Sequence, residues 1–309
     1  MYDSTKPYKD RIIESIKETW NTPYVNVKDG KVYKKTFYPE YHHTDGIGTK
    51  GVYHWQQRTF ENAVLDALAM NLNDLAMERS WPYAIVDHLF VPEDDHEAIL
   101  DIIDYLSGEC LKRDIAITGG ETAIHNNMEG MELSINMLGL IENKKINQLE
   151  AGDYLIGFES SGLHSNGFTV VRELFNEYRK DFTKPTNIYI DEILRLNKKY
   201  DIHGMMHITG GAFTKLKSIL KETNAEINGT HDLIPQEIFW DIYDKGVSDE
   251  EMYKTFNNGI GFIIGVSKEE AEDLLKDIRM FEADIIGEVI QGKGKVKINS
   301  KFSPQKIEF

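Results

Sequence analysis

Residues 62–91, NAVLDALAMNLNDLAMERSWPYAIVDHLFV, contain the pattern that decides the fold. In the first part of this stretch, apolar residues recur at spacings of three and four, which predicts a helix over 62–75 with one apolar face. Trp81-Pro82 predicts a break, and the apolar run at 83–91 predicts a buried strand. The helical stripe consists of Val64, Ala67, Leu68, Leu72 and Leu75.

The alternation of helix and strand continues outward from this stretch. Before it, residues 10–20 predict a short amphipathic helix, and Asp29-Gly30 predicts a hairpin turn. After it come a second amphipathic helix with Ile99, Ile102, Ile103, Leu106 and Cys110 on one stripe, a strand over 114–118 that runs straight into Gly119-Gly120, and a strand over 132–141.

The polar segment 142–153 is the expected domain boundary, with an N-terminal domain over 1–148 and a C-terminal domain over 149–309. Beyond it the alternation resumes, and it predicts an α/β or α+β fold in both halves. Strands are predicted over 154–159, 261–266 and 283–290, and helices are predicted from about Gly167, after 207–211 and from Lys268.

The composition excludes several classes of protein. The 309 residues include 35 Lys and Arg against 51 Asp and Glu, and a net charge of −16 repels a nucleic-acid backbone. No apolar run approaches the ~20 residues that span a bilayer, and the single cysteine, Cys110, rules out an intrachain disulfide. We expect a cytoplasmic protein that binds anionic ligands through metal ions, backbone N–H groups and a few lysines.

Four glycine-rich segments follow predicted strands: DGIGTK (45–50), TGGETA (118–123), SSGLHSNGF (160–168) and HITGGAF (207–213). Glycine lets the backbone approach a ligand closely, and the last two segments open helices whose free N–H groups suit phosphate. One such segment alone is weak support for a phosphate site, because glycine-rich turns before helices are common. Four of them in one acidic chain favour a nucleotide-binding protein.

DGIGTK lacks the glycine and Lys-Ser/Thr spacing of a Walker A loop. It does combine Asp45 and Lys50 around Gly46 and Gly48, a mixture that suits a site for both magnesium and phosphate. A surface hairpin turn is the alternative interpretation.

Carboxylates at two further places complete a predicted metal site. Asp74 follows Asn73 at the end of the predicted helix, and Glu121 comes directly after the glycine pair at a strand end. Together with Asp45 they could hold one or two magnesium ions, which prefer a few carboxylates and substrate phosphates. The alternative is a solvated helix face, although Asp66 and Asp74 interrupt a long run of Ala, Leu and Met.

The polar residues His164, Ser165 and Asn166 precede a predicted helix start, where helix capping is the alternative to ligand binding. Other histidines lack the spacing of known zinc sites and are interpreted as structural or surface groups, with His207 the least secure. These histidines are His42, His43, His125, His203 and His207.

Taken in order, these segments resemble the aminoimidazole ribonucleotide synthetase family. Its superfamily also holds formylglycinamidine ribonucleotide amidotransferase, selenophosphate synthetase, thiamine-monophosphate kinase and a hydrogenase-maturation protein. The resemblance covers about residues 44–298, and its matches are DGIGTK, LDALAMNLNDL, GGETA, SSGLHSNGFTVVR, PTNIYI, HITGGAF and EMYKTFNNGIGF.

The resemblance implies a two-domain fold in which the N-terminal sheets of two subunits join into a barrel, and hence a homodimer. It implies ATP-dependent ring closure of formylglycinamidine ribonucleotide through an iminophosphate, with Lys50, Asp74 and Glu121 as catalytic residues and magnesium on Asp45, Asp74 and Glu121. The resemblance also implies that the ATP phosphates bind at Asp45, Gly46, Gly48, Thr49, Lys50, Gly119 and Gly120. It implies that the substrate binds at His164, Ser165, Asn166, Gly167, Thr209, Gly210 and Gly211.

The chain departs from the family pattern at several places. The family's N-terminal segment is not recognisable, Phe60-Glu61-Asn62 replaces His-Asp-Thr, and Ile124-His125-Asn126 replaces Glu-Met-Pro. The third glycine of the HxTGGG loop is Ala212. Two alternatives therefore stay open: a superfamily kinase or ligase acting on another substrate, and a catalytically silent subunit that binds nucleotide. Selenophosphate synthetase is disfavoured, because Cys110 lies inside a predicted helix.

Overall fold

A computed structural model describes residues 8–309, and the chain divides into two compact units. Unit 1 comprises the described residues up to Leu75 together with Ser80–Asn143, and unit 2 comprises Ala76–Arg79 and Lys144–Phe309. Within residues 8–309, no helix has the length and apolar character needed to cross a membrane.

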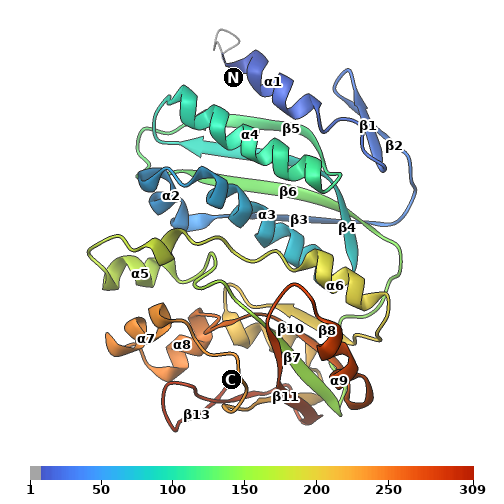
Figure 1. Cartoon of the computed structure of the whole chain (residues 1–309), viewed down its shortest axis with the longest axis vertical. Coiled ribbons are helices and arrows are strands. Elements are labelled where there is room, and N and C mark those ends of the chain that lie inside the picture. The colour runs from blue at the N-terminus through green and yellow to red at the C-terminus, as the bar shows by residue number, and fades with distance from the viewer. Residues whose placement is uncertain (1–7) are drawn as a thin grey trace. The chain divides into compact units, whose positions relative to one another are not determined.

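Unit 1 is built on a four-stranded sheet in the order β3-β6-β4-β5 (Figure 1). Only the β4–β5 pair is parallel, because the crossover helix α4 (His96–Lys112) connects those two strands. The strands are β3 (Glu40–Gly46), β4 (Ser80–Val91), β5 (Ala116–Ile124) and β6 (Glu132–Ile141).

The two faces of β4 differ in burial. Ile85 and Leu89 are fully buried, and the largely apolar helix α3 (Phe60–Met77) supplies many of the core residues of unit 1. Val86, on the opposite face, is 40% exposed. The predicted helix at 62–75 and the predicted strand at 83–91 are confirmed.

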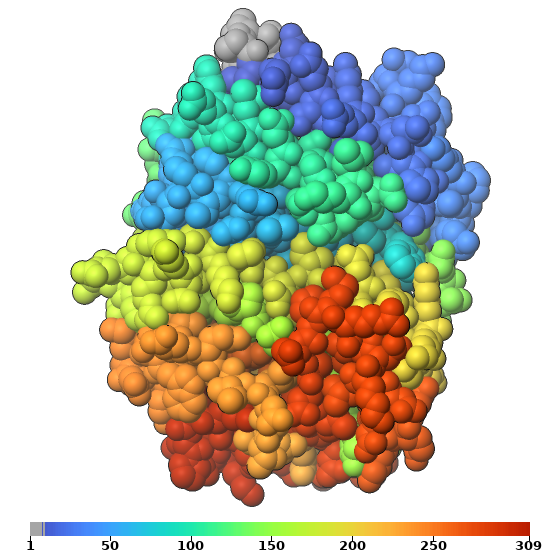
Figure 2. Space-filling model, in the orientation of Figure 1, coloured from blue at the N-terminus to red at the C-terminus, as the bar shows by residue number. Residues whose placement is uncertain are grey.

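The N-terminal part of unit 1 contains α1 (Lys9–Lys17), which packs on α4 and β5. Figure 2 shows α1, in dark blue, against the surface of α4, in blue-green. The hairpin of β1 (Val25–Lys28) and β2 (Lys31–Lys34) turns at Asp29 and Gly30, whose φ angles are 52° and 68°. The predicted hairpin turn is confirmed, since this turn type needs positive φ at both central residues.

Unit 2 is built on a seven-stranded sheet in the order β13-β12-β9-β11-β7-β10-β8, antiparallel except for the β12–β9 pair. Its strands are β7 (Asp153–Glu159), β8 (Gly204–His207), β9 (Thr223–Ile227), β10 (Ile260–Ser267), β11 (Ala283–Gln291), β12 (Val296–Asn299) and β13 (Lys306–Glu308). Its α-helices are α5 (Phe168–Leu174), α6 (Ile190–Asn197), α7 (Glu237–Asp244), α8 (Asp249–Thr255) and α9 (Lys268–Asp277). The 3₁₀ helices are η2 (Lys180–Thr183) and η3 (Ala212–Ile219).

Two predicted boundaries and one predicted helix differ from the structure in detail. Strand β4 continues through Trp81-Pro82, because a register shift between Pro82 and Ala84 accommodates the proline. Strand β5 does not end at Gly119-Gly120 but pairs with β4 as far as Ile124. The helix after 207–211 is the 3₁₀ helix η3, so the amide array of a regular α-helix does not follow that loop.

Candidate nucleotide site

The DGIGTK segment contains the end of β3, Ile47 and the 3₁₀ helix η1 (Gly48–Lys50), which continues into α2 (Gly51–Gln57). Its backbone is held by Glu132 of β6, whose carboxylate accepts hydrogen bonds from the N–H groups of Ile47 and Gly48. A Cβ at Gly46 would lie 2.1 Å from Glu132 Oε1, so a side chain there would displace this carboxylate from its position. Glu132 was not predicted as a functional residue, because nothing in its neighbouring sequence links it to a loop about 85 residues earlier.

Lys50 is fully buried, and its Nζ lies 3.0 Å and 2.8 Å from the two carboxylate oxygens of Asp66. His54 Nε2 lies 2.8 Å from Asp66 Oδ2, and its Nδ1 lies 2.8 Å from Thr59 Oγ1. Burial opposes ionisation of Asp66, but Lys50 and His54 together hold the pKa of that carboxyl well below its usual range. In this conformation Lys50 anchors the loop from inside unit 1 and does not face solvent; its predicted contact with a phosphate stays a prediction.

Asp45 and Asp74 are brought together around His43. His43 Nε2 lies 3.1 Å from Asp74 Oδ2, and its Nδ1 lies 3.0 Å from Asn71 Oδ1. The amide of Asn71 is oriented by its Nδ2, which donates to the carbonyls of Asp45 and Ala67 at 3.1 and 2.9 Å. Both ring nitrogens of His43 therefore face oxygen acceptors, which suits a protonated imidazole.

The charge environment of His43 agrees with that geometry. Burial by itself lowers the pKa of His43, but the hydrogen bond to Asp74, the charges of Asp74 and Asp45 and the bond to Asn71 raise it above its usual value. His43, interpreted from the sequence as a structural or surface group, thus neighbours both predicted metal-binding carboxylates, whose charges favour its protonated form. The sequence carries no signal for this contact, because His43 and Asp74 belong to different elements.

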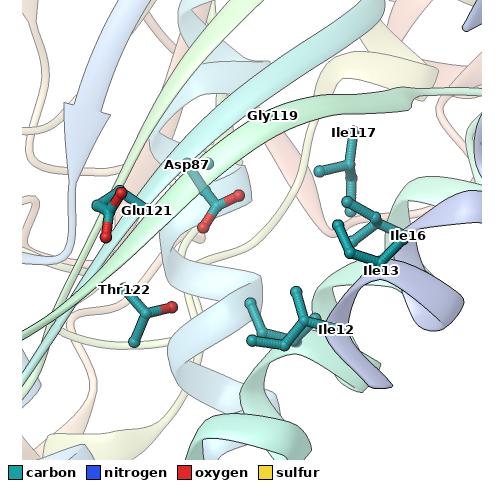
Figure 3. A pocket seen from close by; sticks show the side chains of 10 residues that line it. Ile12, Ile13, Ile16, Asp87, Ile117, Gly119, Glu121 and Thr122 are labelled. Atoms are coloured by element: carbon teal, nitrogen blue, oxygen red, sulfur yellow. The ribbon is translucent and has the colours of Figure 1, made fainter. Parts of the chain in front are cut away.

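The glycine pair of β5 forms one wall of a pocket of about 320 Å³ (Figure 3). Gly120 lies against Asp87 of β4, and a Cβ at that position would fall 2.3 Å from Asp87 Oδ1. Burial raises the pKa of Asp87 to about 7. The lining residues are Ile12, Ile13, Ile16, Asp87, Ile103, Ile117, Gly119, Gly120, Glu121 and Thr122.

Glu121 thus lines this pocket together with Asp87, which was not predicted from the sequence. The only signal in the sequence is a carboxylate inside a largely apolar strand. Within residues 8–309, no three Asp, Glu, His or Cys side chains are close enough together to hold a metal ion by themselves. The predicted donors Asp45, Asp74 and Glu121 fit magnesium only in the mode in which one or two carboxylates act with nucleotide phosphates and water.

In unit 2, the SSGLHSNG loop is held by His164, which is buried and has a φ of 56°. The Nε2 of His164 accepts hydrogen bonds from the backbone N–H groups of Ser161 and Asn187, at 3.2 and 3.5 Å. Ser165 Oγ lies 3.2 Å from Thr186 Oγ1. His164 therefore ties this loop to the segment around Asn187, and its predicted contact with substrate stays untested.

The HITGG loop lies next to the SSGLHSNG loop. A Cβ at Gly210 would lie 3.8 Å from Asn166 Oδ1, so the two predicted substrate loops meet within unit 2. Lys215, which was not predicted from the sequence, donates from its Nζ to Thr209 Oγ1 at 2.9 Å and adds a lysine to this junction. Gly211 and Ala212 both have positive φ, 82° and 40°.

The N-terminal domain model of AIR synthase related proteins matches residues 36–141, and the C-terminal domain model matches residues 150–299. A phosphoribosylformylglycinamidine cyclo-ligase of Saccharolobus solfataricus is 37% identical over 77% of this chain and 73% of its own length. Enzymes of the same name from Methanococcus vannielii and Pyrococcus horikoshii are 35% and 34% identical, over 85% and 83% of this chain and 80% and 81% of their own lengths.

Solved structures with the same fold have much lower sequence identity. The hydrogenase maturation protein HypE in complex with ATP gives a TM-score of 0.73 at 15% identity, covering 99% of this chain and 95% of HypE. Thiamine-monophosphate kinase from Stenotrophomonas maltophilia gives 0.68 at 16% identity, covering 97% and 98%. The predicted mixed α/β fold and the predicted family are confirmed: this chain belongs to the AIR synthase related family, with both of its domains.

Proposed function

We propose that this protein closes the imidazole ring of aminoimidazole ribonucleotide from formylglycinamidine ribonucleotide, with ATP and magnesium, in de novo purine biosynthesis. The observation that carries the proposal is the similarity, over 77–85% of the chain, to several enzymes named phosphoribosylformylglycinamidine cyclo-ligase. An enzyme of this activity is a ligase that forms a C–N bond and releases ADP.

The reaction proceeds in two steps. The amide oxygen of the substrate attacks the γ-phosphorus of ATP, the bond to ADP breaks, and an iminophosphate forms. A nitrogen of the same substrate then attacks the activated carbon, the C–O bond breaks, and inorganic phosphate leaves with that oxygen. Phosphorylation converts a poor leaving oxygen into a good one, so the protein mainly positions groups and neutralises charge.

Unit 1 supplies the groups for ATP. Magnesium, when bound, neutralises the phosphate charge, and we assign it to Asp45, Asp74 and Glu121. We assign the backbone of Gly46–Thr49 and Gly119-Gly120 to the ATP phosphates, and Lys50 to fixing the first of these loops through Asp66.

Unit 2 supplies the groups for the ribonucleotide. The two loops that meet at Asn166 and Gly210 carry Ser165, Gly167, Thr209 and Gly211, and Lys215 adds a positive charge beside Thr209. A lysine and a set of backbone N–H groups suit a phosphate monoester. We therefore assign the substrate phosphate to this junction, with His164 holding the first loop in place.

The assembly we propose is a cytoplasmic homodimer. Val86 and its neighbours on the less buried face of β4 would pair with the same face of a second copy. The exposure of Val86 supports this, since a β-branched residue on a sheet is usually packed.

The decisive assay incubates the purified protein with magnesium-ATP and formylglycinamidine ribonucleotide and follows ADP together with the diazotisable aminoimidazole product. Both products should appear in equal amounts. Absence of substrate-dependent ADP would refute the proposal. ADP without the imidazole would favour a kinase or ligase acting on another substrate, and nucleotide binding without turnover would favour a silent subunit.

Variants test the assignment of the carboxylates. Asp74→Asn and Glu121→Gln should each lower turnover by ~100-fold or more, since each removes a group that stabilises charge in the reaction. Asp101→Asn, at an exposed position on α4, is the matched control and should leave turnover unchanged. Wild-type rates in both site variants would contradict the metal assignment.

A further inference from the structure

The hairpin of β1 and β2, which lies at one end of unit 1 (Figure 1), and the segment after it expose several large apolar side chains. Val32 is 42% exposed, Tyr33 53%, Phe37 95% and Tyr38 45%. All four residues of β2 are exposed, whereas β1 alternates buried and exposed residues. Large apolar residues that gather on one exposed segment, instead of lying singly, indicate an interaction surface.

The same segment is basic in an otherwise acidic chain. Residues 24–38 contain four lysines and one aspartate, a net charge of +3, while the whole chain has −16. Two of these lysines are engaged within unit 1. The other two, Lys28 and Lys31, are exposed and directly opposite each other in the ladder, where like charges repel. No carboxylate among residues 8–309 pairs with either of them, so an incoming carboxylate would relieve the repulsion.

The outer edge of β2 has unpaired backbone groups. Val27 of β1 is the ladder partner of Val32, and its N–H donates away from β2, to the Trp20 carbonyl at 2.8 Å. In an antiparallel ladder, the backbone groups of two opposed residues point either toward each other or away from each other. The N–H and C=O of Val32 therefore point outward, and the same alternation turns those of Lys34 outward. Within residues 8–309, β2 pairs with β1 alone, so these groups form an open edge.

The lysines decide which kind of strand can use this edge. Lysines on an edge strand normally keep other strands away. Pairing with β2 of a second copy would bring the lysines of both copies onto one sheet, where Lys28 and Lys31 already repel each other. A single-stranded nucleic acid would meet lysines and aromatic rings, but the acidic remainder of the chain repels it and it does not pair along a strand edge. A polypeptide strand that carries carboxylates fits both the edge and its charge.

We propose that the outer edge of β2 binds an extended segment of a partner protein in which acidic and apolar residues alternate. The segment adds a third strand to the hairpin through the outward groups of Val32 and Lys34. Successive side chains of a strand point to opposite faces, so Lys31 lies on one face of β2 and Val32 on the other. Acidic side chains of the partner then lie on the lysine face and apolar ones beside Val32.

This inference is independent of the proposed function, since none of these residues belongs to the predicted nucleotide or substrate sites. It adds a macromolecular partner to the small molecules assigned above. The exposed rings of Phe37 and Tyr38 follow β2 in the sequence and enlarge the apolar surface that such a partner can cover.

The experiment titrates the full-length protein into short fluorescently labelled peptides and follows their fluorescence anisotropy. A peptide in which Glu and Val alternate should bind at least ~10-fold more tightly than one in which Lys and Val alternate, because the lysines of the hairpin attract the first and repel the second. The Glu and Val peptide with methylated backbone nitrogens should bind ~10-fold more weakly than its unmethylated form, because it cannot donate to the edge.

Variants separate the contributions of backbone and charge. Val32→Pro removes an N–H that points away from β1, as edge strands tolerate, and should weaken binding of the acidic peptide ~10-fold. Lys31→Glu should shift the preference toward the basic peptide. Lys276→Glu, on α9 with a side chain 71% exposed, is the matched control and should leave both dissociation constants unchanged. Thermal unfolding of each variant checks that it is folded.

Four results would overturn the inference. Wild-type protein could bind the acidic and basic peptides equally, or Val32→Pro could leave the affinity for the acidic peptide unchanged. A single-stranded RNA could bind more tightly than the acidic peptide and lose its binding in Lys31→Glu, which would make the hairpin a nucleic-acid surface. Size-exclusion chromatography could show a dimer that Val32→Pro dissociates, which would assign the edge to a second copy.

Discussion

The loops of the two units are held in place by different physical means. In unit 1, the DGIGTK segment is anchored by charge: Lys50, Asp66 and His54 form a fully buried network, and Glu132 binds the backbone of the loop. In unit 2, the predicted substrate loops are held by backbone conformation, with positive φ at His164, Gly167 and Gly211, and by hydrogen bonds outside any buried ion pair, such as those to His164 and that from Lys215 to Thr209. The free energy of unfolding should therefore be most sensitive to loss of a buried charge in unit 1 and to added side-chain volume in unit 2.

The largest effect is expected where the buried charges are separated. Asp66→Asn leaves the Lys50 ammonium in the interior without its counter-ion, and should lower the free energy of unfolding by ~3–5 kcal/mol. Urea denaturation of the full chain measures it.

The surface pair between Lys112 and Glu109 is the control, because Lys112 is 69% exposed. Lys112→Met should change the free energy of unfolding by ~0–1 kcal/mol. Equal losses of unfolding free energy in Asp66→Asn and Lys112→Met would contradict the view that the buried charges stabilise unit 1.

A slightly smaller effect is expected from a single methyl group in unit 2. Gly167 has a φ of 73°, and a Cβ there would lie 2.1 Å from the ring carbon Cε1 of the buried Phe256. Gly167→Ala should therefore cost ~3 kcal/mol, the sum of left-handed backbone strain and overpacking. Urea denaturation measures the loss.

Gly152 is the matched control, since its φ is 100° and no atom lies within 4 Å of the position of its missing Cβ. Gly152→Ala carries only the backbone cost, ~1–2 kcal/mol. A loss at Gly167 no larger than at Gly152 would show that contact with Phe256 is unimportant.

The pH dependence of stability should reveal a buried histidine in unit 2. Burial, reinforced by the charge of Lys301, lowers the pKa of His231 to about 4. The unfolded chain binds a proton near the ordinary histidine pKa of ~6.5, so stability is complete above that pH and declines as pH falls toward 4. We expect a loss of about 2 kcal/mol over this window, allowing for solvent screening.

Unfolding by urea at a series of pH values between 8 and 4 measures the slope. His231→Gln should flatten it, whereas His125→Gln, at an exposed position, should leave it unchanged. An unaltered slope in His231→Gln would assign the acid sensitivity to other groups.

The smallest effect is expected at the position where the family pattern has a third glycine. Ala212 has a φ of 40°, which an L-residue with a Cβ adopts at a cost. Ala212→Gly should raise the free energy of unfolding by ~1 kcal/mol, net of the greater freedom of glycine in the unfolded chain. The midpoint of thermal unfolding checks it, and a lower midpoint would mean that the alanine side chain packs favourably.

Much of the fold could be predicted from the sequence because it depends on local patterns. The apolar stripe over 62–75 matches one face of α3, and the runs at 83–91 and 132–141 match β4 and β6. The Asp29-Gly30 turn also depends only on neighbouring residues. The family could be predicted for the same reason, since its motifs occur in order along the chain.

Errors arose where strand pairing overrides a local signal. Pro82 and the glycines at 119 and 120 are poor strand residues, yet β4 and β5 continue through them. Register shifts accommodate these residues, and β4 pairs with β5 and β6 on its two sides. Local signals are limited in the same way at the candidate site. Asp45, Asp74 and Glu121 were predicted from motifs, and their roles as ligands stay predictions.

The sequence by itself determined the helices, most of the strands and the family of this protein, because periodicity, turn residues and ordered motifs are local properties. Only the tertiary structure decided that Lys50 points inward to Asp66, that Glu132 holds the glycine loop, and that Asp87 faces five isoleucines in a pocket. These contacts join residues from separate elements, and no spacing along the chain encodes them.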